Sequence, residues 1–239
     1  MIKLENYLFF AIFLPLILGG LLIFHYKRAE KYRYYRFTLI CVILLIGHIL
    51  LPFFDVGIFP KLVNDPFFYL ILFLLGMGFT IIYLRSIEKI SFAEIGWKSE
   101  NVLKEFLIGI IFAFLILIIS VLLEFPFLEI TVPELSLIKI LTVIFFAAGA
   151  IYEECLFRGL LQTHYLQKEH LKNYQIILIQ ALAFLSINFF YFPFNIFGLI
   201  NYLIMFLMSL IVGLLALKYS LISSTTAHLL FVLLAGLLS

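Results

Sequence analysis

The stretch Ala150-Ile151-Tyr152-Glu153-Glu154-Cys155-Leu156-Phe157-Arg158-Gly159 places two acidic residues and one arginine at the end of a long apolar run. On membrane-insertion scales each of these charges costs roughly 2.5–3.5 kcal/mol at the centre of a transmembrane helix. A chain that keeps the charges together in such a run uses them, either to hold helices together or to carry out chemistry.

The composition of the chain indicates an integral membrane protein. Of its 239 residues, 65% are hydrophobic and 13% are charged, whereas soluble domains average roughly 45–50% apolar and about 25% charged residues. The formal net charge of +2 is too small to indicate a nucleic-acid partner. Cys41 and Cys155 both lie in apolar runs, which indicates small buried side chains rather than a disulfide framework.

Apolar stretches of about twenty residues predict transmembrane helices. We therefore expect an all-α bundle of about eight membrane-spanning helices. The expected spans are residues 7–24, 37–54, 66–84, 106–123, 137–160, 176–192, 196–217 and 221–238. The first three form an N-terminal part, residues 1–90, and the remaining spans form a core, residues 91–239.

The distribution of basic residues predicts the orientation of the chain. Of the 16 lysines and arginines, 13 fall in the loops after the first, third, fifth and seventh expected spans when Arg158, at the end of the fifth span, is counted with them. Because Lys and Arg gather in cytoplasmic loops, we expect both termini outside the cell. The aromatic, Ile- and Lys-rich usage is typical of a bacterial plasma-membrane protein. Residues 91–106 are expected to form an amphipathic segment on the cytoplasmic surface, with Trp97 at headgroup depth.

Helical geometry separates the two acidic residues of the opening stretch. Residues four apart share a face, so Glu154 and Arg158 are expected to form an ion pair. Glu153 points elsewhere, beside a like charge in a medium of low dielectric constant. A carboxyl group in that position is suited to general acid or base catalysis. The spacing alone also allows a structural interpretation, in which a buried ion pair is accompanied by one spare carboxylate.

Two further polar residues are expected at a similar depth in the membrane. Asn188 lies well inside the span 176–192, and His228 lies well inside the span 221–238. The candidate catalytic residues are therefore Glu153, Glu154, Arg158, Asn188 and His228. The five histidines of the chain are scattered and form no HExxH sequence, so we expect neither a tight zinc site nor another cofactor.

The sequence Glu-Glu-x-x-x-Arg at residues 153–158 resembles the first motif of the CPBP family of intramembrane proteins. This family includes the type II CAAX prenyl endopeptidases, the bacterial Abi proteins and bacteriocin-immunity proteins. Residues 91–98 are similar to a segment that often precedes the family's core, and residues 213–228 are similar to its third-motif region. The resemblance covers residues 90–239 approximately.

The resemblance implies a polar cavity that opens toward the cytoplasm and a peptide hydrolysis that depends on glutamate. Glu153 would activate water, and Glu154 and Arg158 would shape the site. The chain departs from the family pattern at two positions: Asn188 replaces the His of the second motif, and Val232 replaces the Asn of the third. An amide can donate a hydrogen bond to an oxyanion, but it cannot relay a proton as imidazole does.

Three functions remain open from the sequence. The first is an intramembrane glutamate-type endopeptidase that cleaves membrane-associated peptides, and the second is a catalytically impaired relative that acts as a regulator, scaffold or bacteriocin-immunity factor. The third is a proton-coupled transporter, which the absence of inverted repeats disfavours. The expected partners are the lipid bilayer and a peptide or membrane protein.

Overall fold

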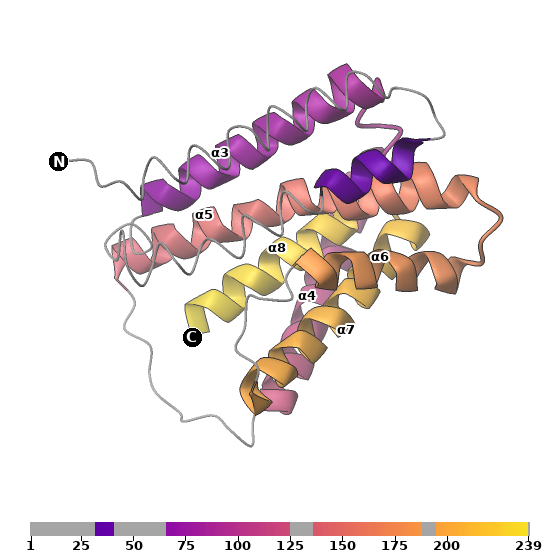
Figure 1. The fold of residues 1–239 in the computed structure, drawn as a ribbon. Helices are drawn as coiled ribbons and strands as arrows, with labels where there is room; N and C mark the ends of the chain where they lie inside the picture. The colour runs from indigo at the N-terminus through magenta and orange to yellow at the C-terminus, as the bar shows by residue number, and fades with distance from the viewer. Residues whose placement is uncertain (1–31, 41–65, 125–135, 188–194, 239) are drawn as a thin grey trace.

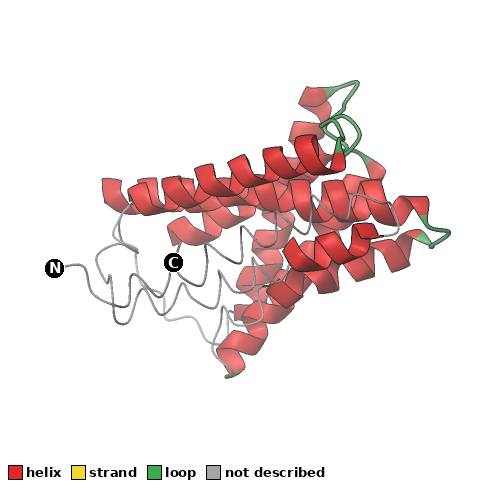
Figure 2. Ribbon diagram, turned by 45° about the horizontal axis from the view of Figure 1, so that its top comes forward, coloured by secondary structure: helices red, strands yellow, loops and turns green. Residues whose placement is uncertain are grey.

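The computed structural model describes residues 32–40, 66–124, 136–187 and 195–238, and every regular element in these residues is a helix (Figure 1). Figure 2 shows the same arrangement, with short loops at the ends of long helices. The predicted all-α class is confirmed for the described residues.

The element bounds can be compared with the predicted spans. The elements are α3 (Pro66–Ile82), the π-helix η3 (Tyr83–Glu88), α4 (Val102–Glu124), α5 (Leu137–Glu154), the π-helix η5 (Cys155–Tyr165), the 3-10 helix η6 (Leu166–Lys168), α6 (Asn173–Ile187), α7 (Ile196–Lys218) and α8 (Leu221–Leu238). A short helix covers residues 33–40.

Four helices in the described part of the chain are long and apolar enough to cross a membrane. They are Val102–Glu124, Leu137–Lys168, Ile196–Lys218 and Leu221–Leu238. These helices contain four of the predicted spans, and α6 is a shorter apolar helix. The predicted span 7–24 and most of the span 37–54 lie outside the described residues, so the predicted count of eight is not confirmed.

Helix α5 lies between two partners that approach it on different sides. It packs against α3 along one side and against α8 on another (Figure 1). A glycine permits the first contact, because a Cβ atom at Gly76 would lie 2.8 Å from the ring of Tyr152. Small residues at helix interfaces let membrane helices approach closely, where larger side chains would separate them.

A glycine also permits close contact between α4 and α8. A Cβ atom at Gly109 would lie 2.7 Å from the carbonyl oxygen of Ser223 and 2.6 Å from Cβ of Thr226. The side of α4 away from α8 carries exposed apolar side chains such as Leu103, Ile111 and Leu122. An exposed apolar face on a helix of 23 residues fits contact with lipid.

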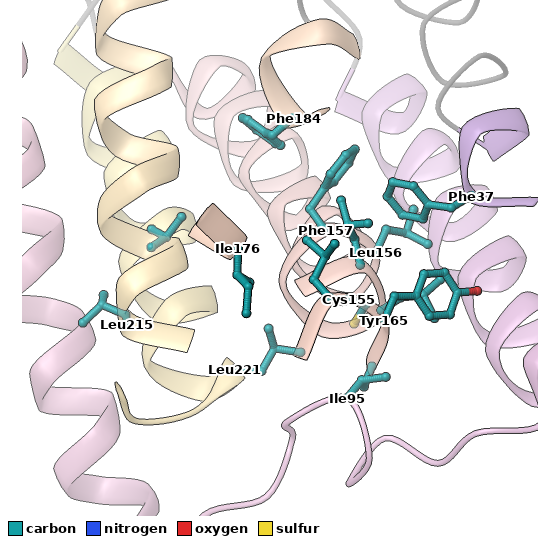
Figure 3. Packing of buried hydrophobic residues seen from close by; sticks show 14 of the residues in the cluster. Phe37, Ile95, Cys155, Leu156, Phe157, Tyr165, Ile176, Phe184, Leu215 and Leu221 are labelled. Atoms are coloured by element: carbon teal, nitrogen blue, oxygen red, sulfur yellow. The ribbon is translucent and has the colours of Figure 1, made fainter. Parts of the chain in front are cut away.

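The helix that begins at Leu137 changes its winding at the two glutamates. It is an α-helix as far as Glu154 and continues as a π-helix over the 11 residues Cys155–Tyr165. π-Helical turns inside α-helices are rare and frequently occur at functional sites. This part of the helix is surrounded by protein, since Phe157, Leu160 and Arg158 are all fully buried, and Figure 3 shows its apolar side chains packed among neighbouring elements.

Residues 91–98 belong to the segment 91–106 that the sequence predicts on the cytoplasmic surface, and Ala93, Glu94 and Lys98 are exposed in the structure. Residues 91–98 form a series of turns packed against the core, and the indole Nε1 of Trp97 donates to Sγ of the buried Cys155 at 3.3 Å. The carbonyl of Gly96 accepts from the backbone N–H of Leu221 at 3.0 Å, at the start of α8. The ring of Trp97, which the sequence predicts at headgroup depth, is half-buried, and a buried sulfur atom accepts from its N–H.

A buried ion pair joins the helix 33–40 to the end of η3. Nε and Nη2 of Arg36 donate to the two carboxylate oxygens of Glu88 at 2.7 and 2.9 Å. The hydroxyl of Tyr83 donates to the same carboxylate at 2.6 Å. Burial acts to raise the pKa of Glu88, but the hydrogen bonds from Arg36 and Tyr83 outweigh it and hold that pKa below its ordinary value.

Candidate active site

The carboxylate of Glu154 lies at the centre of the polar cluster and is fully buried. Three side chains from two helices surround it. Nη1 of Arg158 lies 2.9 Å from Oε1, Nδ1 of His228 lies 2.8 Å from the same oxygen, and the hydroxyl of Ser224 donates to Oε2. The ion pair expected from the spacing of Glu154 and Arg158 is therefore present, and α8 supplies two further donors that the spacing could not indicate.

Helix α8 can supply both donors because of their spacing. Ser224 and His228 are four residues apart, so they lie on the same face of the helix, one turn from each other. Leu221 and Phe231 continue this buried face toward the two ends of the helix. The face packs against α5, and the polar residues in its middle meet Glu154.

The hydrogen bond to Glu154 fixes the orientation of the His228 ring. A carboxylate can only accept hydrogen bonds, so Nδ1 of His228 is the donor. In the neutral imidazole Nε2 is then the proton acceptor. Nε2 lies 3.9 Å from Oε2 of Glu153. This separation is too long for a direct hydrogen bond, but a single water molecule could contact both atoms.

Glu153 is set apart from Glu154 by its exposure. Its side chain is 16% exposed, whereas that of Glu154 is completely buried. The two adjacent acids therefore occupy different environments: Glu154 is surrounded by donors, and Glu153 lies at the edge of the cluster and faces the ring of His228. This arrangement agrees with the division of labour that helical geometry predicts.

Arg158 connects the cluster to α6 and α7. Its Nη2 donates to Oγ of Ser209 at 2.7 Å, and its guanidinium carbon lies 4.5 Å from the centre of the Phe184 ring. A cation over a ring face is attracted by the ring's quadrupole, more strongly in a desolvated place. Phe184 also packs edge to face on His228, at 5.7 Å between ring centres. Phe184 thus contacts two members of the cluster.

Four of the five residues predicted for the site come together in the structure. They are Glu153, Glu154, Arg158 and His228. Asn188 lies outside the described residues. Val232 is half-buried and packs against the apolar core, which adds no polar group at that position.

The sequence analysis did not single out three polar residues that belong to the cluster or contact it: Gln180, Ser209 and Ser224. The signal that could have found them is a polar side chain inside a long apolar helix. Ser224 could also be inferred from its position four residues before His228. Ser209 and Gln180 lie on other helices, and only the packing of α6, α7 and η5 places them beside Arg158.

Comparison with known families agrees with this geometry. Residues 135–234 match the family model described as type II CAAX prenyl endopeptidase Rce1-like. No significant match was found among curated proteins or among solved structures. The matched residues contain α5, η5, α6, α7 and nearly all of α8, and with them the whole cluster around Glu154. Over these residues the match confirms the resemblance to the type II CAAX prenyl endopeptidases that the Glu-Glu-x-x-x-Arg motif predicts.

Proposed function

We propose that this protein is an intramembrane glutamate-type endopeptidase, in which Glu153 activates the water that hydrolyses the peptide bond. The observation that carries this proposal is the placement of Nε2 of His228 at 3.9 Å from Oε2 of Glu153. The two atoms can hold one water molecule between a carboxylate and a ring nitrogen of defined orientation. Membership of residues 135–234 in an endopeptidase family supports the same reaction.

In the proposed reaction Glu153 accepts one proton of the water as its oxygen attacks the carbonyl carbon of the substrate. The resulting tetrahedral intermediate carries a negative charge on the former carbonyl oxygen. Glu153 then returns the proton to the leaving nitrogen as the C–N bond breaks. A positioned general base of this kind typically contributes about 10²–10⁴ in rate.

The other groups of the cluster hold Glu153 and His228 in place. Glu154 fixes the tautomer of His228 by accepting from Nδ1, so that Nε2 can accept the second proton of the water in a hydrogen bond. Arg158 compensates the buried charge of Glu154. We assign the oxyanion contact to the amide of Asn188, because amide side chains stabilise oxyanions in other enzymes.

The substrates proposed are peptides or proteins associated with the bilayer, reached from the cytoplasmic side. The charge distribution, with 13 of 16 basic residues in alternate loops, supports an orientation with both termini outside the cell. The four apolar helices of the described residues place the cluster within a membrane protein. A water molecule must therefore reach Glu153 from a polar opening rather than from lipid.

One observation favours a second function. Val232 packs against the apolar core at the position where the family's third motif has an Asn, and Asn188 stands in place of a His. A chain with these replacements could keep the fold and act as a regulator, scaffold or immunity factor without cleaving peptides.

The experiment that separates the two functions uses the protein purified in liposomes with a library of membrane-associated peptides. Wild type is expected to cleave a subset, and Glu153→Gln is expected to lower the rate by about 10²–10⁴-fold. Glu100→Gln is the matched control, since Glu100 is exposed and far from the cluster in sequence. If wild type and Glu153→Gln give the same products at the same rates, the hydrolysis does not come from this site. If wild type cleaves nothing, the second function is favoured.

A further inference from the structure

Five polar groups extend from the candidate site into the interior, away from Glu153. Arg158 and Gln162 lie one turn apart on η5, Ser209 and Gly213 lie one turn apart on α7, and Gln180 lies on α6. The side chains of Arg158, Gln162, Gln180 and Ser209 are all fully buried. A set of buried polar groups on three membrane helices is costly unless its members satisfy one another.

The hydrogen bonds between these groups leave two oxygen atoms without a donor. Nη2 of Arg158 and Nε2 of Gln180 both donate to Oγ of Ser209, at 2.7 and 3.0 Å. Nε2 of Gln162 donates to the carbonyl of Gly213 at 2.8 Å. Among the described residues, Oε1 of Gln162 and Oε1 of Gln180 then accept no hydrogen bond, although both are buried.

The two oxygens lie beside the same point of α7. A Cβ atom at Gly213 would lie 2.6 Å from Oε1 of Gln180 and 3.1 Å from Oε1 of Gln162. Two buried acceptors beside one point are an unfavourable arrangement, and each unsatisfied group costs about 1–3 kcal/mol. The absence of a side chain at Gly213 is what allows both amides to approach the helix.

A rotation of the Gln180 amide by about 180° removes this conflict, since its oxygen and its NH₂ group have nearly the same shape and exchange places. Oε1 of Gln180 then faces the hydroxyl of Ser209 and accepts from it. Nε2 of Gln180 takes the place beside Gly213 and faces Oε1 of Gln162. Both amide oxygens then have a donor, while Nε of Arg158 still has no hydrogen-bond partner among the described residues.

We propose that Ser209, Gln180 and Gln162 are positioning residues, which form one directed hydrogen-bond chain that holds Arg158 against Glu154. In this chain Arg158 donates to Ser209, Ser209 to Gln180, Gln180 to Gln162, and Gln162 to the carbonyl of Gly213. All the donors point away from the guanidinium, so the charge of Arg158 polarises each bond in the same direction and strengthens it.

The chain explains how an arginine is held in place inside a membrane protein. With Nη2 fixed by Ser209 and the ring of Phe184 over its plane, the guanidinium keeps Nη1 at 2.9 Å from Glu154. Glu154 in turn holds His228 through Nδ1. The catalytic part of this inference rests on the proposed function, because it concerns the residues that orient the proposed catalytic pair.

The hydrogen bond between the two glutamines can be tested without any activity assay. Gln180→Met and Gln162→Met remove the amides at similar volume, and a double-mutant cycle on reversible unfolding in mixed micelles measures their coupling. We expect a non-additivity of about threefold in the unfolding equilibrium constant, the average for hydrogen bonds between membrane helices. Additive effects of the two substitutions on the unfolding equilibrium would overturn the proposed hydrogen-bond chain. A cycle of Gln180→Met with Ser120→Ala, a buried serine on α4, is the control and is expected to be additive.

The positioning role is tested by kinetics on the same preparations. We expect kcat to fall in the order wild type, Ser209→Cys, Ser209→Ala, as the hydroxyl is weakened and then removed, with KM unchanged and with the control Ser120→Ala at the wild-type rate. A wild-type kcat in Ser209→Ala would overturn the positioning role. If wild-type protein hydrolyses no peptide, the proposed function fails while the coupling between Gln180 and Gln162 still decides whether the chain exists.

Discussion

Nδ1 of His228 donates to Oε1 of Glu154 across 2.8 Å, and this bond joins the last turn of α5 to the middle of α8. Its partners are separated by 74 residues in the chain. The bond has a consequence at the other side of the ring, because it leaves Nε2 to face Glu153. A fully buried carboxylate thus orients the imidazole, and the more exposed carboxylate beside it is the one that can meet a substrate.

Replacing Glu154 by Gln is expected to destabilise the fold more than it changes the shape of the site. The amide oxygen can still accept from His228, and the NH₂ group can donate to the hydroxyl of Ser224, but the variant leaves Arg158 as a buried cation without its counter-charge. Loss of one partner of a buried ion pair costs about 3–5 kcal/mol. Reversible unfolding in mixed micelles measures this loss, and Glu100→Gln on the surface is expected to change stability by less than about 0.5 kcal/mol. A Glu154→Gln protein as stable as wild type would show that the carboxyl carries no charge.

The contact between α4 and α8 predicts that alanine substitutions at two glycines have different effects on stability. Gly109→Ala is expected to cost about 1–3 kcal/mol, since the new Cβ would lie 2.7 Å from a backbone carbonyl on α8, which cannot rotate away. Gly78→Ala on α3 meets no atom within 4 Å, so it is expected to be neutral or to stabilise by about 0.5–1 kcal/mol. Thermal unfolding of the two variants in the same detergent checks both signs. Equal effects would contradict the close approach of α4 and α8.

The ion pair between Arg36 and Glu88 predicts a pH dependence of stability. Since the pKa of Glu88 lies below its ordinary value of 4.5 in the folded protein, its ionised form stabilises the fold fully above that value. This contribution is lost as the pH falls from 4.5 through the lower folded pKa. The difference in unfolding free energy between wild type and Glu88→Gln should therefore be constant near neutral pH and shrink below 4.5. A difference that grows on acidification would contradict the ionised pair.

The contact between Trp97 and Cys155 can be followed by fluorescence, since Trp97 is the only tryptophan of the chain. Sulfur at 3.3 Å from the indole nitrogen is close enough to quench its emission. Cys155→Ala is therefore expected to raise the emission intensity of the folded protein. The intensities of wild type and variant should converge when both are unfolded, because the contact is then lost. An unchanged folded intensity would place the indole of Trp97 away from the thiol of Cys155.

Much of the local structure follows from the sequence because it depends on neighbours in the chain. The composition determines the membrane class, and the apolar runs predict the ends of α4, α7 and α8 to within about four residues and the start of α5. The i, i+4 spacing suffices to predict the ion pair of Glu154 and Arg158. Helical geometry also suffices to predict that Glu153 lies apart from this ion pair, since adjacent residues on a helix point about 100° apart.

Only the tertiary structure decides which helix meets which, and this is where sequence reasoning falls short. The periodicity of α8 shows that Ser224 and His228 share a face, but not that the face meets Glu154. The contact between Trp97 and Cys155, which are 58 residues apart, likewise depends on the packing of distant segments. The sequence by itself therefore determined the charged residues and their membrane setting. The packing of α6, α7 and α8 around η5 decided which donors surround each charge. Buried polar groups form hydrogen bonds with the groups next to them in the folded protein, and these come from distant parts of the chain.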